Sequence, residues 1–226
     1  MSITAFYARK GGVGKSTHAF NFACYVVART SGKVLLVSTD PQGDSVRWSG
    51  EADRRLRIDD MFESSFGYSA LFAPERVVDA DFAREWGFDL VIVDMPPAAE
   101  AIANVYPDVW VSPIDGRNAL MDTMPAIKAM QEQGGQILWL PNRIDAAGSV
   151  SKKLILGGLD QVRNSVVLPT ILDSVSVAKV AECSQPVWAV PYGAGTQGAR
   201  AVQDVCDEIL KYLPGLPPLT KRRKRS

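Results

Sequence analysis

The sequence predicts an α/β protein with a single domain, in which a doubly wound, mainly parallel sheet carries helices on both faces. Three observations predict this class. Short apolar runs recur along the 226 residues, segments with helical spacing separate them, and the runs do not alternate between apolar and polar residues. Strands without such alternation are typical of a parallel sheet that is covered on both sides.

Each predicted strand is one of these apolar runs and ends at a polar or turn-forming stretch. The strands are expected at residues 3–7, 34–37, 90–93, 109–111, 137–140 and 166–168. Helices are expected between them, at residues 15–29, 98–105, 122–133, 174–183 and 198–213. The stretch 44–88 has the least regular pattern, with short helical pieces and many charges. No linker divides the chain, so residues 1–213 are expected to form one domain.

The composition excludes several classes of protein. Hydrophobic residues make up 46% and charged residues 22%, which is the balance of a protein with a full-sized core rather than a disordered or disulfide-stapled chain. The three scattered cysteines, Cys24, Cys183 and Cys206, form no CxxC pair and indicate reduced thiols. No run approaches the roughly 20 apolar residues of a membrane span, and no export signal is recognised. We therefore expect a cytoplasmic protein with no membrane partner.

The end of the chain differs from the body in charge. Residues 214–226 are rich in proline and then basic, and we expect them to form a disordered tail. The chain has 25 basic and 25 acidic residues, and five of the basic ones lie in this tail, so the body carries a net charge of about −5. A basic tail suits a polyanion such as DNA, although a solvated end is the alternative interpretation. The five cations are Lys221, Arg222, Arg223, Lys224 and Arg225.

Residues 10–17, between the first predicted strand and the first predicted helix, have the composition of a phosphate-binding loop. Glycines let backbone N–H groups approach phosphate oxygens, and the following helix directs its positive dipole end to the same place. Lys15 would neutralise the β- and γ-phosphates, and the Ser16 hydroxyl would bind Mg²⁺. The nucleotide-binding residues expected here are Lys10, Gly11, Gly12, Val13, Gly14, Lys15, Ser16 and Thr17.

This loop departs from the standard GxxxxGK[ST] pattern, because Arg9 stands where the first glycine is required. It matches the deviant form KGGxGK[ST], which has a second lysine, here Lys10, near its start. In this the chain resembles the ParA/MinD group of deviant Walker A ATPases along most of its length, and it is most similar to the short ParA-type (ParF-like) partition proteins. The resemblance implies that Lys10 reaches across a dimer interface to the nucleotide of the other subunit, which would couple ATP binding to dimerisation.

Two carboxylates complete the expected catalytic and magnesium site. Asp40 lies in a sequence similar to the family's DxDPQG motif, and the resemblance implies that it positions the attacking water and contacts the magnesium shell. Ser38 replaces the acid that the family often has at the first position, and Asp44 is a second candidate nearby. Asp94 ends an apolar strand like a Walker B aspartate and would meet Mg²⁺ through water. The predicted catalytic residues are Lys10, Lys15 and Asp40, and the predicted metal ligands are Ser16, Asp40 and Asp94.

Asn142 and Arg143 follow the predicted strand at 137–140 and are expected to complete the nucleotide site. The resemblance implies that Asn142 bonds the edge of adenine, since an amide can donate and accept at once. The residues NRID are also similar to the NKxD guanine motif, but the deviant loop favours ATP over GTP. ATP and Mg²⁺ are therefore the expected cofactors.

The resemblance implies an ATPase whose slow hydrolysis is stimulated by a partner protein. As an ATP-bound homodimer it would bind non-specific DNA on the nucleoid and segregate plasmid or chromosome DNA through a ParB-like adaptor. Arg200 and Lys211 join the basic tail as candidate DNA contacts. Two alternatives stay open: the same motor could position a protein cargo, such as a chemoreceptor cluster or a microcompartment, or the protein could cycle on membranes like MinD. An iron–sulfur relative is disfavoured, because no cysteine lies between Cys24 and Cys183.

Overall fold

One sheet organises the molecule. The computed structural model describes residues 1–217 except 51–54, 145–156, 158, 160–161 and 163. Within this part of the chain, eight strands lie in the order β3-β4-β2-β5-β1-β6-β7-β8; β3 is antiparallel to β4, and the other neighbouring pairs are parallel. The strands are β1 (Ser2–Phe6), β2 (Val34–Ser38), β3 (Asp60–Glu63), β4 (Ser69–Phe72), β5 (Leu90–Asp94), β6 (Val109–Ile114), β7 (Gln136–Pro141) and β8 (Ser165–Val167).

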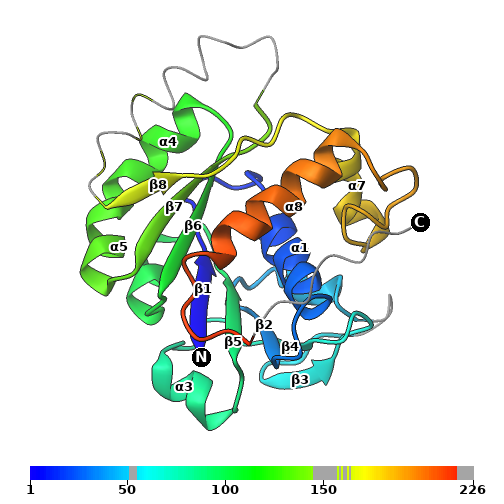
Figure 1. Ribbon diagram of the computed structural model, residues 1–226. Helices are drawn as coiled ribbons and strands as arrows, with labels where there is room; N and C mark the ends of the chain where they lie inside the picture. The colour runs from blue at the N-terminus through cyan, green and yellow to red at the C-terminus, as the bar shows by residue number, and fades with distance from the viewer. Residues whose placement is uncertain (51–54, 145–156, 158, 160–161, 163, 218–226) are drawn as a thin grey trace.

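Helices cover both faces of the sheet (Figure 1). One face packs against α1 (Lys15–Val27), α7 (Val175–Cys183) and α8 (Gln197–Leu210). The other packs against α3 (Ala80–Glu85), the 3-10 helix η1 (Ala99–Asn104), α4 (Arg117–Thr123) and α5 (Ile127–Gln133), with the 3-10 turn η2 (Met124–Ala126) joining the last two. The short helix α2 (Asp44–Arg47) follows β2. This arrangement confirms the predicted fold class, a doubly wound and mainly parallel sheet.

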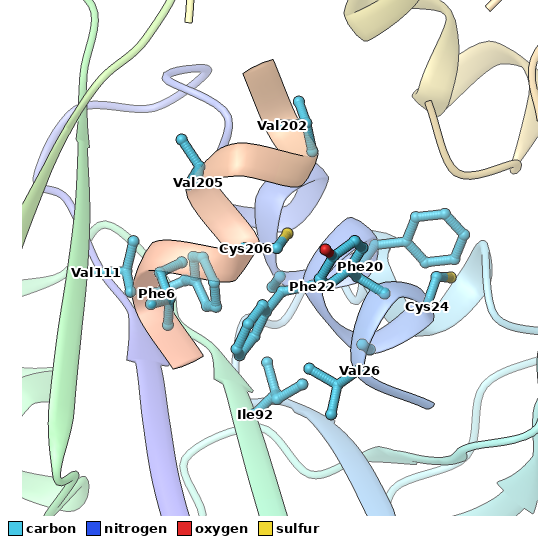
Figure 2. Packing of buried hydrophobic residues seen from close by; sticks show 14 of the residues in the cluster. Phe6, Phe20, Phe22, Cys24, Val26, Ile92, Val111, Val202, Val205 and Cys206 are labelled. Atoms are coloured by element: carbon cyan, nitrogen blue, oxygen red, sulfur yellow. The ribbon is translucent and has the colours of Figure 1, made fainter. Parts of the chain in front are cut away.

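Apolar side chains fill the space between one face of the sheet and the helices α1 and α8 (Figure 2). Phe6 from β1 contacts Phe22 of α1, with ring centroids 6.0 Å apart. The apolar stripe of α8 lies against the same layer and is buried, so it belongs to the core; its members include Val202, Val205, Cys206, Ile209 and Leu210. The position of α1 fixes where the loop that precedes it meets the sheet.

The predicted elements and the observed ones differ mainly in the stretch 44–88. The six predicted strands and the helices at 15–29, 174–183 and 198–213 are confirmed with small changes at their ends. The helix expected at 98–105 is the 3-10 helix Ala99–Asn104, and the helix expected at 122–133 starts earlier, at Arg117, and is interrupted around Pro125. The stretch 44–88 contains β3, β4, α2 and α3. Each of these is four to six residues long, too short for a sequence period to stand out.

The chain returns to the start of β1 after α8. The Ser2 hydroxyl donates a hydrogen bond to the carbonyl of Pro214, and Leu216 packs against the core of the α1 and α8 face. A Cβ on Gly32 would lie 3.1 Å from the Pro217 ring, so these two residues are in close contact. The first residues of the predicted tail therefore lie against the body, whereas its five cations lie outside the described residues. Among the described helices, none is long and apolar enough to cross a membrane.

Candidate nucleotide site

The phosphate-loop residues connect β1, at the centre of the sheet, to α1. Gly12 and Gly14 have φ values of 73° and 99°, in the left-handed region that favours glycine. Gly14 is the N-cap of α1 and has no side chain to cap the helix, so the first N–H groups of α1 are directed to the loop. Free N–H groups and a positive dipole end make this position suitable for an anion such as a phosphate.

The two residues that follow β7, Asn142 and Arg143, donate hydrogen bonds to the backbone of the phosphate loop. Asn142 is 1% exposed, and its Nδ2 donates to the Val13 carbonyl at 2.8 Å. Arg143 Nη1 donates to the Gly12 carbonyl at 3.2 Å. A Cβ on Gly14 would lie 2.7 Å from Asn142 Nδ2, so only glycine fits at this point. The structure places both predicted base-site residues against the loop backbone, and the adenine contact of Asn142 stays a prediction.

The carboxyl ends of β2 and β5 bring the predicted catalytic residues together. Ser38 and Asp94 are register partners on these neighbouring strands, and Phe6 of β1 pairs with Asp94 on the other side. Lys15, the first residue of α1, is 7% exposed. Burial lowers the pKa of Lys15, and the charges of Asp94 and Asp40 oppose that shift. Lys15, Asp40 and Asp94 are therefore electrostatically coupled at one edge of the sheet.

Asp94 is a fully buried carboxylate. Burial raises its pKa from 3.8 to about 6, and the hydroxyls of Ser45 and Ser16 and the charge of Lys15 act in the opposite direction. Within the described part of the chain, neither of its carboxylate oxygens has a hydrogen bond of standard geometry. A buried carboxylate beside two hydroxyls and without a firm partner suits Mg²⁺, which prefers oxygen ligands and retains several waters. The residues present therefore fit a magnesium ion.

Asp40 lies in a tight turn after β2. Its carbonyl accepts from the N–H of Gly43 at 2.9 Å, and its Oδ1 accepts from the N–H of Gln42 at 2.9 Å. The Ser38 hydroxyl donates to the Asp40 carbonyl at 3.3 Å, so the residue in place of the usual acid supports this turn. Burial and the charge of Asp40 raise the pKa of Asp44, the first residue of α2. Asp40, whose charge acts on Lys15 of the phosphate loop, is thus also electrostatically coupled to a second carboxylate, Asp44.

Lys10 has a partner that sequence reasoning missed. Its Nζ donates to both oxygens of the Asp115 carboxylate, at 2.9 and 3.0 Å. A signal was present, because Asp115 comes directly after β6, and polar residues at the carboxyl ends of parallel strands are where chemistry is expected. Ser45, beside Asp94, was also missed, and its sequence context gives no comparable signal.

The two described candidates for DNA contact lie on α8 and just after it. Arg200 is exposed on this helix. Lys211, just beyond its end, is also exposed and forms an ion pair with Glu208, which offsets part of its charge. The other five candidates, in the basic tail, lie outside the described residues. The structure therefore brings together the predicted nucleotide and metal residues, and the DNA contacts stay a prediction.

Comparison with known proteins gives a match for the start of the chain. Residues 1–65, which contain β1, the phosphate loop, α1 and β2, match the family described as AAA domain. The maintenance of carboxysome distribution protein A of Gloeobacter kilaueensis is 34% identical over 101 residues, 45% of this chain and 41% of that protein. The chromosome-partitioning ATPase Soj of Thermus thermophilus is 34% identical over 110 residues, 40% of this chain and 44% of that protein. The chain thus matches less than half the length of these relatives.

Solved structures show the same fold over nearly the whole chain. The septum site-determining protein MinD of Pyrococcus horikoshii, complexed with Mg-ADP, superposes with a TM-score of 0.71 at 19% identity, covering 92% of this chain and 95% of that one. At this identity the likeness concerns the fold. Together with the match over residues 1–65, it shows a P-loop NTPase fold like that of MinD.

Proposed function

We propose that the protein is a ParA-like ATPase, of the short ParF-like type, that binds Mg-ATP at residues 10–17, dimerises with ATP bound and positions a cargo on non-specific DNA. The observation that carries the proposal is the loop itself. It begins with Lys10, leads through Gly14 into α1, and places Lys15 in electrostatic contact with Asp40 and with the buried Asp94. Burying a lysine beside two carboxylates costs free energy, so this arrangement favours a bound phosphate over a turn that binds no ligand.

Each residue of the site has a role in this proposal. The N–H groups of residues 11–17 and Lys15 would bind the phosphates. Asn142 and Arg143 hold the loop through its carbonyls and would contact the base. Ser16 and Asp94 would hold Mg²⁺, with Asp40 in its outer shell. When bound, Mg²⁺ supplies positive charge that stabilises the phosphates during transfer. Asp40 orients the attacking water, and Lys10 reaches the nucleotide of the second subunit.

The proposed cargo is plasmid or chromosome DNA carried by a ParB-like adaptor that stimulates hydrolysis. The relative that is a chromosome-partitioning ATPase supports this choice, and the relative named for carboxysome distribution supports a protein cargo. Both are 34% identical to the chain, so identity favours neither. A membrane-cycling role like that of MinD is a further alternative, and ATP-dependent sedimentation with liposomes would detect it.

DNA binding would follow from dimerisation. The protein would be cytoplasmic and associated with the nucleoid. Arg200, Lys211 and the basic tail supply cations that neutralise phosphates without reading sequence. Two copies of a weak cationic surface in one dimer bind one duplex much more tightly than one copy does. ATP would therefore control DNA affinity through dimerisation, with no need for the tail to start at the phosphate loop. The last described residue, Pro217, lies beside Gly32 and not at that loop.

The substitution Lys10→Ala is expected to preserve ATP binding and abolish ATP-dependent dimerisation. The loop glycines and Lys15 still hold the phosphates, but nothing reaches the second nucleotide. A fluorescent ATP analogue measures binding, and light scattering after size exclusion measures the dimer. Lys128→Ala, which removes an exposed lysine from α5, is the matched control. A Lys10→Ala protein that still dimerises with ATP would contradict the role assigned to Lys10.

A further inference from the structure

The contact between Lys10 and Asp115 ties the start of the phosphate loop to the segment after β6. Both oxygens of Asp115 accept from Lys10 Nζ, at 2.9 and 3.0 Å. The Lys10 side chain is 39% exposed, and that of Asp115 is 14% exposed. The carboxylate is thus largely sheltered, while the lysine remains open to solvent on one side. A side chain placed this way is able to leave its partner without unfolding the site.

The backbone around this contact fixes the position of the carboxylate. Asp115 follows Ile114, whose position is set by the parallel pairing of β6 with β7. The N–H of Arg9 donates to the hydroxyl of Thr123, a buried residue at the end of α4, at 3.3 Å. The segment from β6 to the end of α4 therefore contacts the start of the loop at two separate points. The ion pair is therefore one of two contacts that join this segment to the start of the loop, and is not an isolated pair of surface charges.

We propose that Asp115 is a positioning residue that holds Lys10 within its own subunit until ATP-bound subunits associate. The proposal rests on the function proposed above, in which Lys10 acts on the nucleotide of the second subunit. One ammonium group cannot satisfy Asp115 and also bind a distant phosphate. Each subunit must therefore break this ion pair when the dimer forms, and the pair raises the protein concentration at which dimerisation occurs.

The size of the effect follows from the exposure of the pair. A partly exposed ion pair changes an equilibrium by about twofold to fivefold. A dimer breaks two such pairs, so Asp115→Asn is expected to lower the dimer dissociation constant in ATP by about fourfold to 25-fold. Asp122→Asn removes an equal charge from an exposed position on α4 and is expected to leave this constant unchanged. Asp115→Glu retains the carboxylate and is expected to restore most of the wild-type value.

Two measurements test the proposal on the whole 226-residue chain. The first is the rate at which a limiting amine-acylating reagent modifies Lys10 in the nucleotide-free protein, followed by peptide mass spectrometry. Asp115→Asn should raise this rate and Asp122→Asn should not; equal rates would show that Asp115 does not hold Lys10. The second is sedimentation velocity over a range of protein concentrations with ATP, which gives the dimer dissociation constant.

The outcomes separate the two proposals. Tighter dimerisation of Asp115→Asn, with Asp122→Asn unchanged, supports the holding role. Weaker dimerisation of Asp115→Asn, while the wild-type protein dimerises normally, would mean that Asp115 acts inside the dimer and would overturn it. A wild-type protein that stays monomeric with ATP at every concentration would refute the proposed function and, with it, a hold that delays dimerisation.

Discussion

Replacing Lys15 with alanine is expected to lower ATP turnover by about 10²- to 10³-fold. This is the usual effect of removing a preorganised protein group that stabilises the transition state. Lys15 is a buried cation of the site, and its charge is coupled to Asp94 and Asp40. Without it, the phosphates of ATP would face two carboxylates with no compensating ammonium from their own phosphate loop. Binding should weaken along with turnover, because the same repulsion acts on the bound substrate.

Phosphate release with saturating Mg-ATP measures this effect, and circular dichroism shows whether the variant is folded. Lys128→Ala, at an exposed position on α5, is the control for loss of a lysine. A folded Lys15→Ala protein that turns over ATP at the rate of the control would show that residues 10–17 are not the catalytic phosphate site.

The substitution Asp94→Asn is expected to have two effects of opposite kind. It should abolish magnesium-dependent hydrolysis, because an amide cannot supply the negative charge that the ion requires. It should also stabilise the nucleotide-free protein near neutral pH by about 1 to 3 kcal/mol, since a pKa shift from 3.8 to about 6 corresponds to about 3 kcal/mol. The pKa of about 6 already includes the opposing effects of the Lys15 charge and of the Ser45 and Ser16 hydroxyls.

The pH dependence of this stabilisation has a definite sign. The pKa of Asp94 is higher in the folded state than in the unfolded state, so the folded protein holds the proton more firmly. Wild-type stability therefore falls, relative to Asp94→Asn, as the pH rises from about 4 to about 6, and the difference is constant above that range. Urea unfolding at pH 4 and pH 8 measures it, with Asp122→Asn as the control. Equal stabilities at pH 8 would contradict the cost assigned to the buried charge.

The sequence was sufficient for the centre of the fold because its strands are buried on both faces. Runs such as residues 34–37 and 90–93 are continuously apolar, and such runs are distinct in any sequence. β3 is a strand of four residues at the edge of the sheet, antiparallel to its neighbour and only partly buried. Neither face of this strand is fully buried, so its sequence shows no regular pattern of apolar residues. Pairing with β4 determines its structure, and pairing is not visible in the local sequence.

The site shows the same division between local and long-range information. Glycines with positive φ and a buried lysine follow from the loop motif, and Asp94 follows from its place at the end of a strand. The bond from Asn142 to the Val13 carbonyl joins residues far apart in the chain, and so does the bond from Lys10 to Asp115. Such contacts depend on β6 lying beside β1 and β7 lying beside β6, an arrangement that only the folded structure provides.

In the proposed function, ATP converts this protein into a DNA-binding dimer. Retention of an unrelated duplex with ATP, with ADP and without nucleotide, at low and high salt, tests it most directly, using the whole chain and a variant truncated after Leu219. We predict retention that requires ATP and falls steeply with salt, weaker in the truncated protein because the five tail cations are lost. Retention that ignores the nucleotide, or none under any condition, would contradict the claim.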